Sequence, residues 1–409
     1  MKKRVVVAMS GGVDSSVCAA LLKKQGFDVV GVFMKLWAPG ETTINNQQPT
    51  ANIENRCCNI ESLEGARRVA AKLGIPFYTI DLVEEFRKYV VDYYIKEYSN
   101  CRTPNPCVIC NKFIKFKFLL EKALALEAEY LATGHYVRLA GGQELGIRNW
   151  ELGKKRPKSY HLNPKTYRLL IAIDKTKDQS YFLWTLTQEQ LKHLLFPIGD
   201  YTKAQVREMA KKWGLPTAER AESQGLCFIG YWDNREFLSR FIEPKPGPIL
   251  DLKGNILGEH KGLPFYTIGQ RRGLPELKIK NYAFKKKGET PPLYVIELDQ
   301  KNNALIVGEE RDLYKKELEV KNVSWINGAN ETNLTNGTNL TNETDGVNGT
   351  NLAARIRYGH PAIPCKISKL KTKDSELKVT FQKPVRAITP GQSIVFYKGE
   401  EVLGGGVIR

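Results

Sequence analysis

The sequence contains no run of about 18 apolar residues, the length that a helix needs to cross a bilayer, so we expect no membrane-spanning helix and no membrane partner. A short apolar stretch follows the basic N-terminus, but it runs directly into glycines, which excludes a secretory signal. Acidic residues are also in short supply, since 44 Asp and Glu stand against 62 Lys and Arg, a formal net charge of +18. This excess favours a polyanionic partner, with nucleic acid as the first candidate.

Cysteine is sparse, with eight residues in a chain of 409. In the absence of a secretory signal, these thiols predict a reducing, cytoplasmic compartment, where clustered cysteines act in catalysis or bind metal. One Cys-x-x-Cys pair occurs, at Cys107 and Cys110, and no second pair follows that would complete a zinc site. A redox couple, a nucleophile with a neighbouring thiol and half of a metal site all remain open at this point.

Residues 7–16 read Val-Ala-Met-Ser-Gly-Gly-Val-Asp-Ser-Ser and lack the Lys-Ser/Thr ending of a Walker loop. They lie between an apolar run, Val5–Val7, and a helical pattern, Val17–Lys24. This order predicts a buried strand, a glycine loop and a helix N-terminus, whose backbone N–H groups together attract phosphate. The loop resembles the Ser-Gly-Gly-x-Asp-Ser signature of the PP-loop ATP pyrophosphatases, which transfer AMP and release pyrophosphate. An ordinary glycine-rich turn is the alternative.

The pattern of apolar residues changes along the chain. Its first 130 residues or so alternate strands with helical patterns, which predicts a parallel sheet covered on both faces, with strands at Val5–Ala8, Val29–Phe33, Phe77–Asp81 and Tyr130–Thr133 and helices that include Ser62–Leu73 and Lys112–Ala128. Ligands of such sheets bind at the carboxyl ends of the strands. From about Phe228 the segments are short, alternating and rich in turns, including a predicted hairpin of Leu293–Leu298 and Ala304–Val307. This second pattern predicts one or two small β-barrels.

Further motifs follow the glycine loop in a fixed order along the chain. They are Thr103–Lys112 (Thr-Pro-Asn-Pro-Cys-Val-Ile-Cys-Asn-Lys), Ala132–Tyr136, Lys177–Phe182, Ser223–Ile229 and His260–Leu274. Together with the loop they resemble the bacterial tRNA-specific 2-thiouridylases over nearly the whole chain, apart from two insertions. The resemblance implies an α/β N-terminal domain of the PP-loop type, followed by two small β-rich domains of which the last is a β-barrel.

The chain is too long for one core, and with this resemblance we expect three domains. Residues 1–230 would form the ATP-binding catalytic domain, with an inserted loop at about 140–165. Residues 231–300 would form a small central β-rich domain, and 301–409 a C-terminal β-barrel that binds tRNA. An Asn/Thr-rich insertion at about 327–350 lacks the apolar residues that offset ordering entropy, which predicts disorder.

In this family the C2 oxygen of the wobble uridine, position 34, is replaced by sulfur. A carbonyl oxygen is a poor leaving group, and adenylation by ATP turns it into the bridging oxygen of AMP, with release of pyrophosphate. The resemblance therefore implies ATP and Mg²⁺ as cofactors. Asp14 would either help to hold Mg²⁺ or cap the following helix. The residues implied to bind ATP are Ala8, Met9, Ser10, Gly11, Gly12, Val13, Asp14, Ser15, Met34 and Gly134.

The resemblance also assigns the sulfur chemistry. Cys227 would carry a persulfide, supplied by a cysteine desulfurase or a persulfide relay protein, and Cys110 would complete the transfer by forming a disulfide with it. The two Cα atoms must then approach to about 4.4–6.8 Å, which loop closure on tRNA binding would achieve. Cys107 departs from the pattern, since some members carry an Asp there as a proposed general acid/base. A [4Fe–4S] cluster on Cys107, Cys110 and Cys227 is the alternative.

The tRNA partner would be recognised through its anticodon stem-loop. By the resemblance the target base lies against Asn105, Pro106 and Cys107, and the contacts to tRNA come from Lys177, Asp178, Gln179, Arg357 and Tyr358. Stacking on Tyr358 and a phosphate contact of Arg357 would suit a single-stranded loop. Two rival functions remain: another PP-loop enzyme, which needs no cysteine pair, and a zinc-bearing RNA-binding protein, which releases no pyrophosphate.

Overall fold

A computed structural model describes residues 2–37, 60–141, 166–222, 225–230, 232–277, 292–326, 352–370 and 376–409. The Asn/Thr-rich insertion at 327–350, nearly all of the insertion at 140–165, and the first two residues of the motif Ser223–Ile229 lie outside these ranges. Within the described ranges, no helix is long and apolar enough to cross a membrane.

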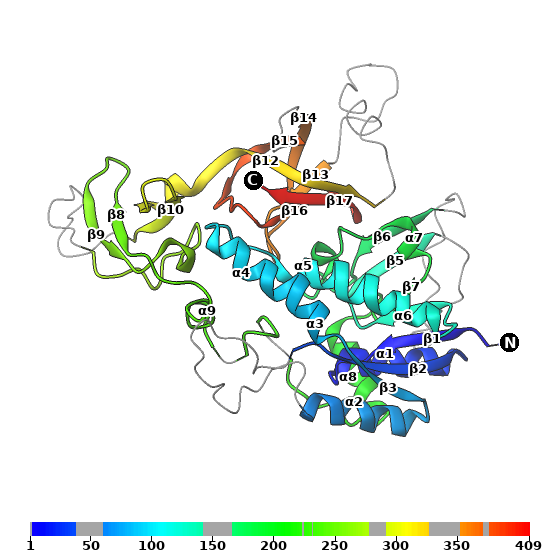
Figure 1. The fold of residues 1–409 in the computed structure, drawn as a ribbon. Helices are drawn as coiled ribbons and strands as arrows, with labels where there is room; N and C mark the ends of the chain where they lie inside the picture. Colours follow the sequence, from blue (N-terminus) through cyan, green and yellow to red (C-terminus); the bar gives the residue numbers. More distant parts are fainter. Residues whose placement is uncertain are drawn as a thin grey trace, which may run out of the picture.

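A parallel sheet forms the centre of the first part of the chain (Figure 1). Its strand order is β3-β2-β1-β4-β7, and every neighbouring pair is parallel. The strands predicted from the sequence are confirmed to within two residues at each end, and β7 is an addition. The bounds are β1 Arg4–Ala8, β2 Asp28–Lys35, β3 Phe77–Asp81, β4 Tyr130–Thr133 and β7 Leu194–Leu195.

The two faces of this sheet carry different helices because successive side chains of a strand point to opposite sides. Val5 and Val7 share a hydrophobic cluster with residues of α1 (Val13–Lys24), α2 (Ile60–Leu73) and α8 (Lys203–Lys212). Val6 and Ala8 instead pack with the helices that follow Asn105. Both faces are thus covered, as the strand–helix alternation predicts.

The helical segment after Asn105 begins earlier than the sequence predicts. It runs through α5 (Pro106–Ile109), the π-helix η2 (Cys110–Leu119) and α6 (Leu120–Ala125), whereas the prediction starts at Lys112. The Asn105 side chain accepts a hydrogen bond from the Val108 N–H, and proline at the first helical position needs no donor. Consequently Cys107, not Cys110, lies in the first helical turn.

A four-stranded sheet follows in the middle of the chain, at the left of Figure 1. Its order is β10-β11-β8-β9, and the predicted hairpin is confirmed as the antiparallel pair β10–β11. This pair spans residue 300, so we propose that the middle domain extends through β11 rather than ending at 300. The bounds are α9 Asn234–Leu238, β8 Gly247–Leu250, β9 Ile256–His260, β10 Tyr294–Asp299 and β11 Ala304–Gly308.

The C-terminal strands form a barrel, at the top of Figure 1. They follow the order β12-β15-β14-β13-β16-β17, and pairing of β12 with β17 closes the circle. The predicted α/β domain, central β-rich domain and final barrel are thus confirmed. The bounds are β12 Tyr314–Trp325, β13 Leu352–Arg355, β14 Ile363–Lys369, β15 Leu377–Arg386, β16 Ser393–Lys398 and β17 Glu401–Ile408.

Two shared cores hold these parts together. The hairpin of β5 (Val137–Gly141) and β6 (Tyr167–Ile171) extends the barrel sheet through pairing of β6 with β17. One hydrophobic cluster contains Val137 and Leu169 of this hairpin together with Val6 of the parallel sheet and Tyr397 of the barrel. A second cluster joins the helices α3 (Val83–Phe86), η1 (Arg87–Val91) and α4 (Asp92–Ser99) to the middle sheet. Burial of these shared apolar surfaces fixes the barrel and the middle sheet against the part that contains the parallel sheet.

Candidate functional site

The glycine loop links β1 to α1 and is held by its own polar atoms. The Ser15 hydroxyl accepts a hydrogen bond from the Ser10 N–H over 3.2 Å and donates to the Gly12 carbonyl over 3.1 Å. Gly11 has a φ of +73°, and a Cβ at this position would lie 2.1 Å from the Ser62 carbonyl oxygen. Only glycine therefore fits here, and the loop is curled at the N-terminus of a twelve-residue helix.

Gly134 lies against the same helix start. A Cβ on Gly134 would come within 2.9 Å of the Asp14 carbonyl carbon and of the Ser15 nitrogen. Gly134 follows β4, the neighbour of β1 on the side opposite β2, so the loop and Gly134 meet where the strand order reverses. Such a switch point at the carboxyl edge is the usual ligand position in an open α/β sheet. Half-buried Met34 lies near the carboxyl end of β2, so the predicted nucleotide residues gather at one edge.

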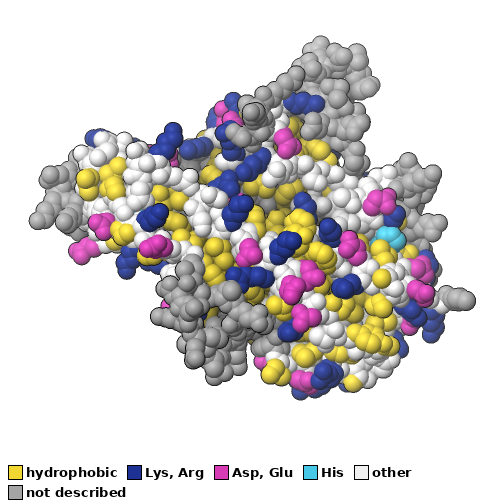
Figure 2. All heavy atoms as spheres, in the orientation of Figure 1, with side chains coloured by type: hydrophobic (Ala, Val, Ile, Leu, Met, Phe, Trp, Pro, Cys, Tyr) yellow, Lys and Arg dark blue, Asp and Glu magenta, His cyan; other side chains and the backbone are white. Residues whose placement is uncertain are grey.

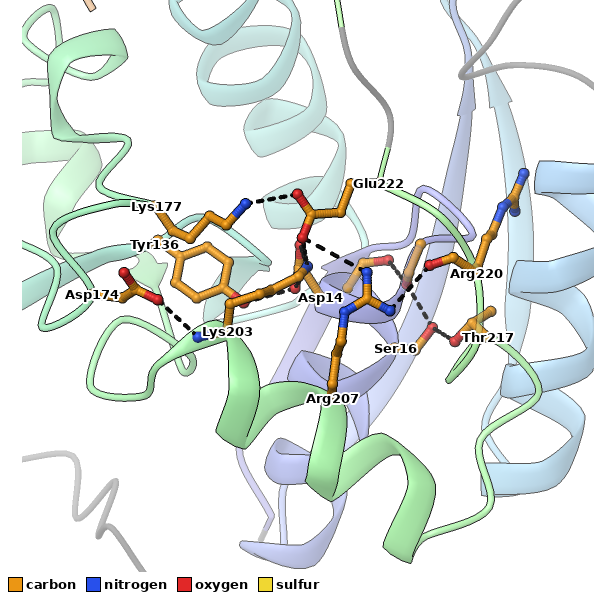
Figure 3. A network of polar contacts seen from close by, with 12 residues as sticks. Asp14, Ser16, Tyr136, Asp174, Lys177, Lys203, Arg207, Thr217, Arg220 and Glu222 are labelled. Carbon is orange, nitrogen blue, oxygen red and sulfur yellow. Dashed lines mark hydrogen bonds and ion pairs between the residues drawn. The ribbon is translucent and has the colours of Figure 1, made fainter. Parts of the chain in front are cut away.

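Asp14 is engaged by side chains from two other elements. The Lys203 ammonium lies 2.7 and 2.8 Å from its two carboxylate oxygens, and the Tyr136 hydroxyl donates to it over 2.8 Å (Figure 3). The helix cap is Gly12, so Asp14 does not have the capping role that the sequence left open. Among the described residues no group of three or more His, Cys, Asp or Glu could hold a metal ion. A role of Asp14 in holding Mg²⁺ stays a prediction, since this ion is commonly held by one or two carboxylates together with phosphates.

Several charged residues beside Asp14 were not predicted as site residues from the sequence. Glu222 lies 2.7 Å from Lys177, 3.6 Å from Lys203 and 3.7 Å from Arg207 (Figure 3). Arg220 donates to the Gly11 carbonyl over 2.8 Å. The available signal was the spacing of Lys203 and Arg207, which lie four residues apart and so share one face of a helix.

The two thiols implied in sulfur transfer contact one core from different segments. Cys110 begins η2, Cys227 lies in the described segment 225–230, and both pack, partly buried, against the hydrophobic cluster that contains Ile114 and Phe228. The six described cysteines form no disulfide. The structure thus brings the two segments to the same cluster, although 116 positions of sequence separate the thiols.

Cys107 approaches this cluster through Tyr94. The Tyr94 ring centroid is 5.1 Å from that of Phe228, the residue after Cys227. Burial raises the pKa of the Tyr94 hydroxyl, with smaller contributions from Tyr98 and Cys107. The described residues nevertheless contain no three-cysteine group close enough to bind one metal. This finding concerns a single metal ion, so the alternative [4Fe–4S] cluster, whose cysteines each bind a different iron, stays a prediction, and we derive no step through it.

The residues predicted to line the base pocket meet the barrel at Tyr181 and Phe182. Burial raises the pKa of Tyr181, while hydrogen bonding to Asn105 and the charge of Arg357 oppose this shift, so both side chains lie close to its hydroxyl. The Tyr358 ring is 42% exposed, and its centroid lies 4.6 Å from that of Phe182. The predicted tRNA residues of the barrel thus lie next to the helix start that carries Asn105, Pro106 and Cys107.

The motif Lys177-Asp178-Gln179 splits into one outward and two inward side chains. The Asp178 carboxylate is buried and accepts hydrogen bonds from the Ala172 N–H and from Ser180. The Gln179 side chain accepts from the Tyr136 N–H over 2.9 Å. Lys177 is partly exposed and pairs with Glu222 beside the glycine loop, and the predicted tRNA contacts of all three stay predictions.

His135 is buried beside the rings of Phe116 and Phe196. Its Nδ1 lies 2.7 Å from the Thr133 hydroxyl and its Nε2 3.4 Å from the Lys115 ammonium. Burial, reinforced by the Lys115 charge, lowers the pKa of the imidazole well below its usual value of 6.5. A buried, neutral histidine whose two ring nitrogens both contact other side chains suits the positioning of a loop better than proton transfer to a substrate.

The basic excess does not form one patch on the face seen in Figure 1. Figure 2 shows Lys and Arg side chains spread over that face and mixed with Asp and Glu. Charge alone therefore does not locate a nucleic-acid site there, and the location rests on the glycine loop and the two thiol segments.

Comparisons with known proteins match this architecture part by part. Family models match residues 3–231 (tRNA methyl transferase HUP domain), 235–309 (tRNA methyl transferase PRC-barrel domain) and 315–408 (Aminomethyltransferase beta-barrel domain). The chain is 43% identical over 411 residues to the tRNA-specific 2-thiouridylase MnmA of Desulforamulus reducens, covering 100% of this chain and 98% of the relative. It is 44% identical to MnmA 1 of Caldanaerobacter subterraneus, with the same coverage, and 44% identical to MnmA of Halothermothrix orenii, with 99% of each chain covered.

Proposed function

The chain belongs to the family of tRNA-specific 2-thiouridylases, and from this premise we propose that it is an ATP-dependent tRNA-uridine 2-sulfurtransferase of the cytoplasm. One observation carries the proposal beyond the family. A phosphate-type loop lies at the carboxyl edge of the sheet, while Cys110 and Cys227 contact one hydrophobic cluster. Both parts are needed, because sulfur insertion requires an activated oxygen and a delivered sulfur.

Activation would proceed at the glycine loop. The C2 oxygen of the wobble uridine attacks the α-phosphorus of ATP, the bond to the β-phosphate oxygen breaks, and pyrophosphate leaves. The loop N–H groups and the start of α1 would bind phosphate oxygens, while Gly134 leaves room for the close approach of the loop. Mg²⁺, entering with the nucleotide, would supply charge neutralisation of the phosphates.

Sulfur delivery would then use the two thiols. The terminal sulfur of a Cys227 persulfide attacks C2 and AMP leaves with the former C2 oxygen. The Cys110 thiolate attacks the Cys227 sulfur, a Cys110–Cys227 disulfide forms, and 2-thiouridine is released. In the alternative order, Cys110 first releases hydrosulfide, which then attacks C2. Either order leaves a disulfide that must be reduced by an external thiol before the next turnover.

The substrate would be the anticodon stem-loop of tRNA, whose unpaired bases cost little to turn out of the stack. We place the target base at Asn105, Pro106 and Cys107, because this helix start lies beside Arg357 and Tyr358. A cysteine desulfurase or a persulfide relay protein would load Cys227. At position 107, a thiol would take the acid/base role of the Asp in other members.

The test is a reaction with ATP, Mg²⁺, a persulfide source and unmodified tRNA, followed by nuclease digestion and mass analysis for 2-thiouridine. Product should vanish in Cys110→Ser and Cys227→Ser and persist in Cys101→Ser, a matched control whose thiol is also partly buried.

Cys107→Asp should keep activity that Cys107→Ala loses. Pyrophosphate release without thiolated product would reassign the nucleophile, and the absence of both would overturn the enzyme function.

A further inference from the structure

Three cationic side chains converge on one carboxylate beside the glycine loop. Lys177 precedes the short helix η3 (Ser180–Phe182), while Lys203 and Arg207 lie on α8, and all three contact Glu222 at 2.7 to 3.7 Å (Figure 3). The ammonium of Lys203 also contacts both carboxylate oxygens of Asp14. The group is therefore fixed to the N-terminal turn of α1, directly after the loop.

Glu222 is the carboxylate that these three cations share. Lys203 has a second partner in Asp14, and the nearby Asp174 carboxylate accepts a hydrogen bond from the Lys203 N–H. The hydrogen bond from Lys177, together with Lys203 and Arg207, lowers the pKa of Glu222 although burial opposes the shift. Glu222 is thus ionised, and it holds together cations that would repel one another without it.

We propose that Glu222 is an internal substitute for the β- and γ-phosphates of the nucleotide. It pairs with Lys177, Lys203 and Arg207 in the free protein, and the phosphates replace it as their partner when the nucleotide binds. The proposal rests on the proposed use of ATP and goes beyond it by assigning a polyphosphate subsite to residues outside the glycine loop. A single carboxylate satisfies three cations poorly, whereas a pyrophosphate group brings more oxygens and more charge. Keeping the cations in place before binding reduces the ordering cost but makes the nucleotide compete with Glu222.

Glu219 offers a matched control three residues away. Within the part of the chain that the structure describes, it pairs with Lys211 alone, at 3.1 Å, and its side chain is 81% exposed. Replacing either glutamate by glutamine removes the same charge from the same segment. Any difference between the two variants therefore reports the position of the carboxylate and not the net charge of the protein.

The experiment is calorimetric titration of the full chain with MgATP, inorganic pyrophosphate and AMP. We expect Glu222→Gln to bind MgATP and pyrophosphate roughly threefold to tenfold more tightly, since a half-buried ion pair no longer competes. AMP, which lacks the β- and γ-phosphates, should bind both proteins equally, and Glu219→Gln should match the wild type for every ligand. Lys177→Gln should weaken pyrophosphate binding and leave AMP binding unchanged.

Three results would overturn the proposal. Equal or weaker pyrophosphate binding by Glu222→Gln would show that Glu222 supports the cations instead of competing for them. An equal gain for AMP would show a general charge effect. A wild-type chain that binds none of the three ligands would overturn the proposed use of ATP as well, which distinguishes that failure from the first two.

Discussion

Arg355 on β13 of the barrel donates a hydrogen bond of 2.8 Å to the Asp178 carboxylate, whose side chain is only 1% exposed. The Arg355 guanidinium also lies 4.6 Å from the centroid of the Tyr397 ring. Asp178 itself belongs to the segment that continues into Tyr181 and Phe182, next to Asn105. A buried ion pair therefore joins the barrel to the segment that lines the proposed base pocket.

Removing the arginine should leave a buried charge without its cation. We predict that Arg355→Met lowers the free energy of unfolding by about 3 to 5 kcal/mol, the usual cost of breaking a buried pair. The expected sign is a loss, because the remaining donors to Asp178 are an N–H group and Ser180, none of which carries charge. Urea unfolding followed by tryptophan fluorescence measures the change.

An exposed ion pair of the same barrel provides the control. Arg409 lies 2.8 Å from Glu319, and both side chains are more than 40% exposed. Arg409→Met should therefore cost less than about 1 kcal/mol. In the Arg355→Met background, Asp178→Asn should recover part of the loss, and equal costs for Arg355→Met and Arg409→Met would contradict the buried-pair interpretation.

The sequence was most informative where one local pattern dictates the conformation. Val5–Val7 is apolar on both faces, and the glycines that follow permit a φ of +73° at Gly11, so strand, loop and helix could be predicted together. The end of β4 could be placed beside the loop for the same reason, since parallel strands share a carboxyl edge. In this region the local residue types and the topology of the parallel sheet predict the same arrangement.

The prediction failed where long-range contacts decide. Nothing local signals that Glu222 meets Lys177 and Lys203, because their proximity depends on how α8 packs against α1. The predicted helix start at Lys112 was also wrong, because the fixed φ of Pro106 suits the first helical position. Asp178, whose contact with tRNA stays a prediction, also holds the barrel through Arg355, and no local pattern signals that role.

The close approach of Gly134 to α1 gives a steric prediction. Gly134→Ala should weaken MgATP binding at least tenfold, because its Cβ would lie 2.9 Å from the backbone at Asp14 and Ser15 and must displace the helix start. Gly254→Ala is the control, since its Cβ meets nothing within 4 Å while its φ of +85° costs about 1 kcal/mol of strain. Calorimetry should show normal binding for the control, and a matching loss in both variants would refute local displacement.

Tyr358 tests the proposed contact with the anticodon loop. We predict that Tyr358→Ala weakens tRNA binding about tenfold to a hundredfold, since stacking of one base is worth about 1 to 3 kcal/mol. Tyr358→Phe should keep the affinity, because the ring and not the hydroxyl stacks. Tyr314→Ala removes another exposed ring, 46% accessible, and should change nothing. Filter binding at fixed salt measures the tRNA affinity of all three variants. If Tyr358→Ala binds tRNA as tightly as Tyr314→Ala does, Tyr358 is not part of the tRNA site.

His135 gives the pH dependence of stability a definite sign. The folded state keeps this imidazole neutral, because burial and Lys115 lower its pKa well below 6.5, whereas the unfolded chain takes up a proton near pH 6.5. Proton uptake by the unfolded state means that the free energy of unfolding falls as the pH decreases below 6.5, by about 1.4 kcal/mol at pH 5.5 for this group. Stability contributed by a neutral His135 is therefore present at pH 7 and lost towards pH 5.

The matched variant is His135→Asn, which keeps a polar side chain beside Thr133 but cannot titrate. Urea unfolding of both proteins at pH 7.5 and pH 5.5 should show that the wild type loses about 1.4 kcal/mol more than the variant between these two values. The difference isolates His135, since His260 and the carboxylates titrate alike in both proteins. If both lose the same amount, the folded protein accommodates a protonated His135, and Lys115 must then move away from the ring.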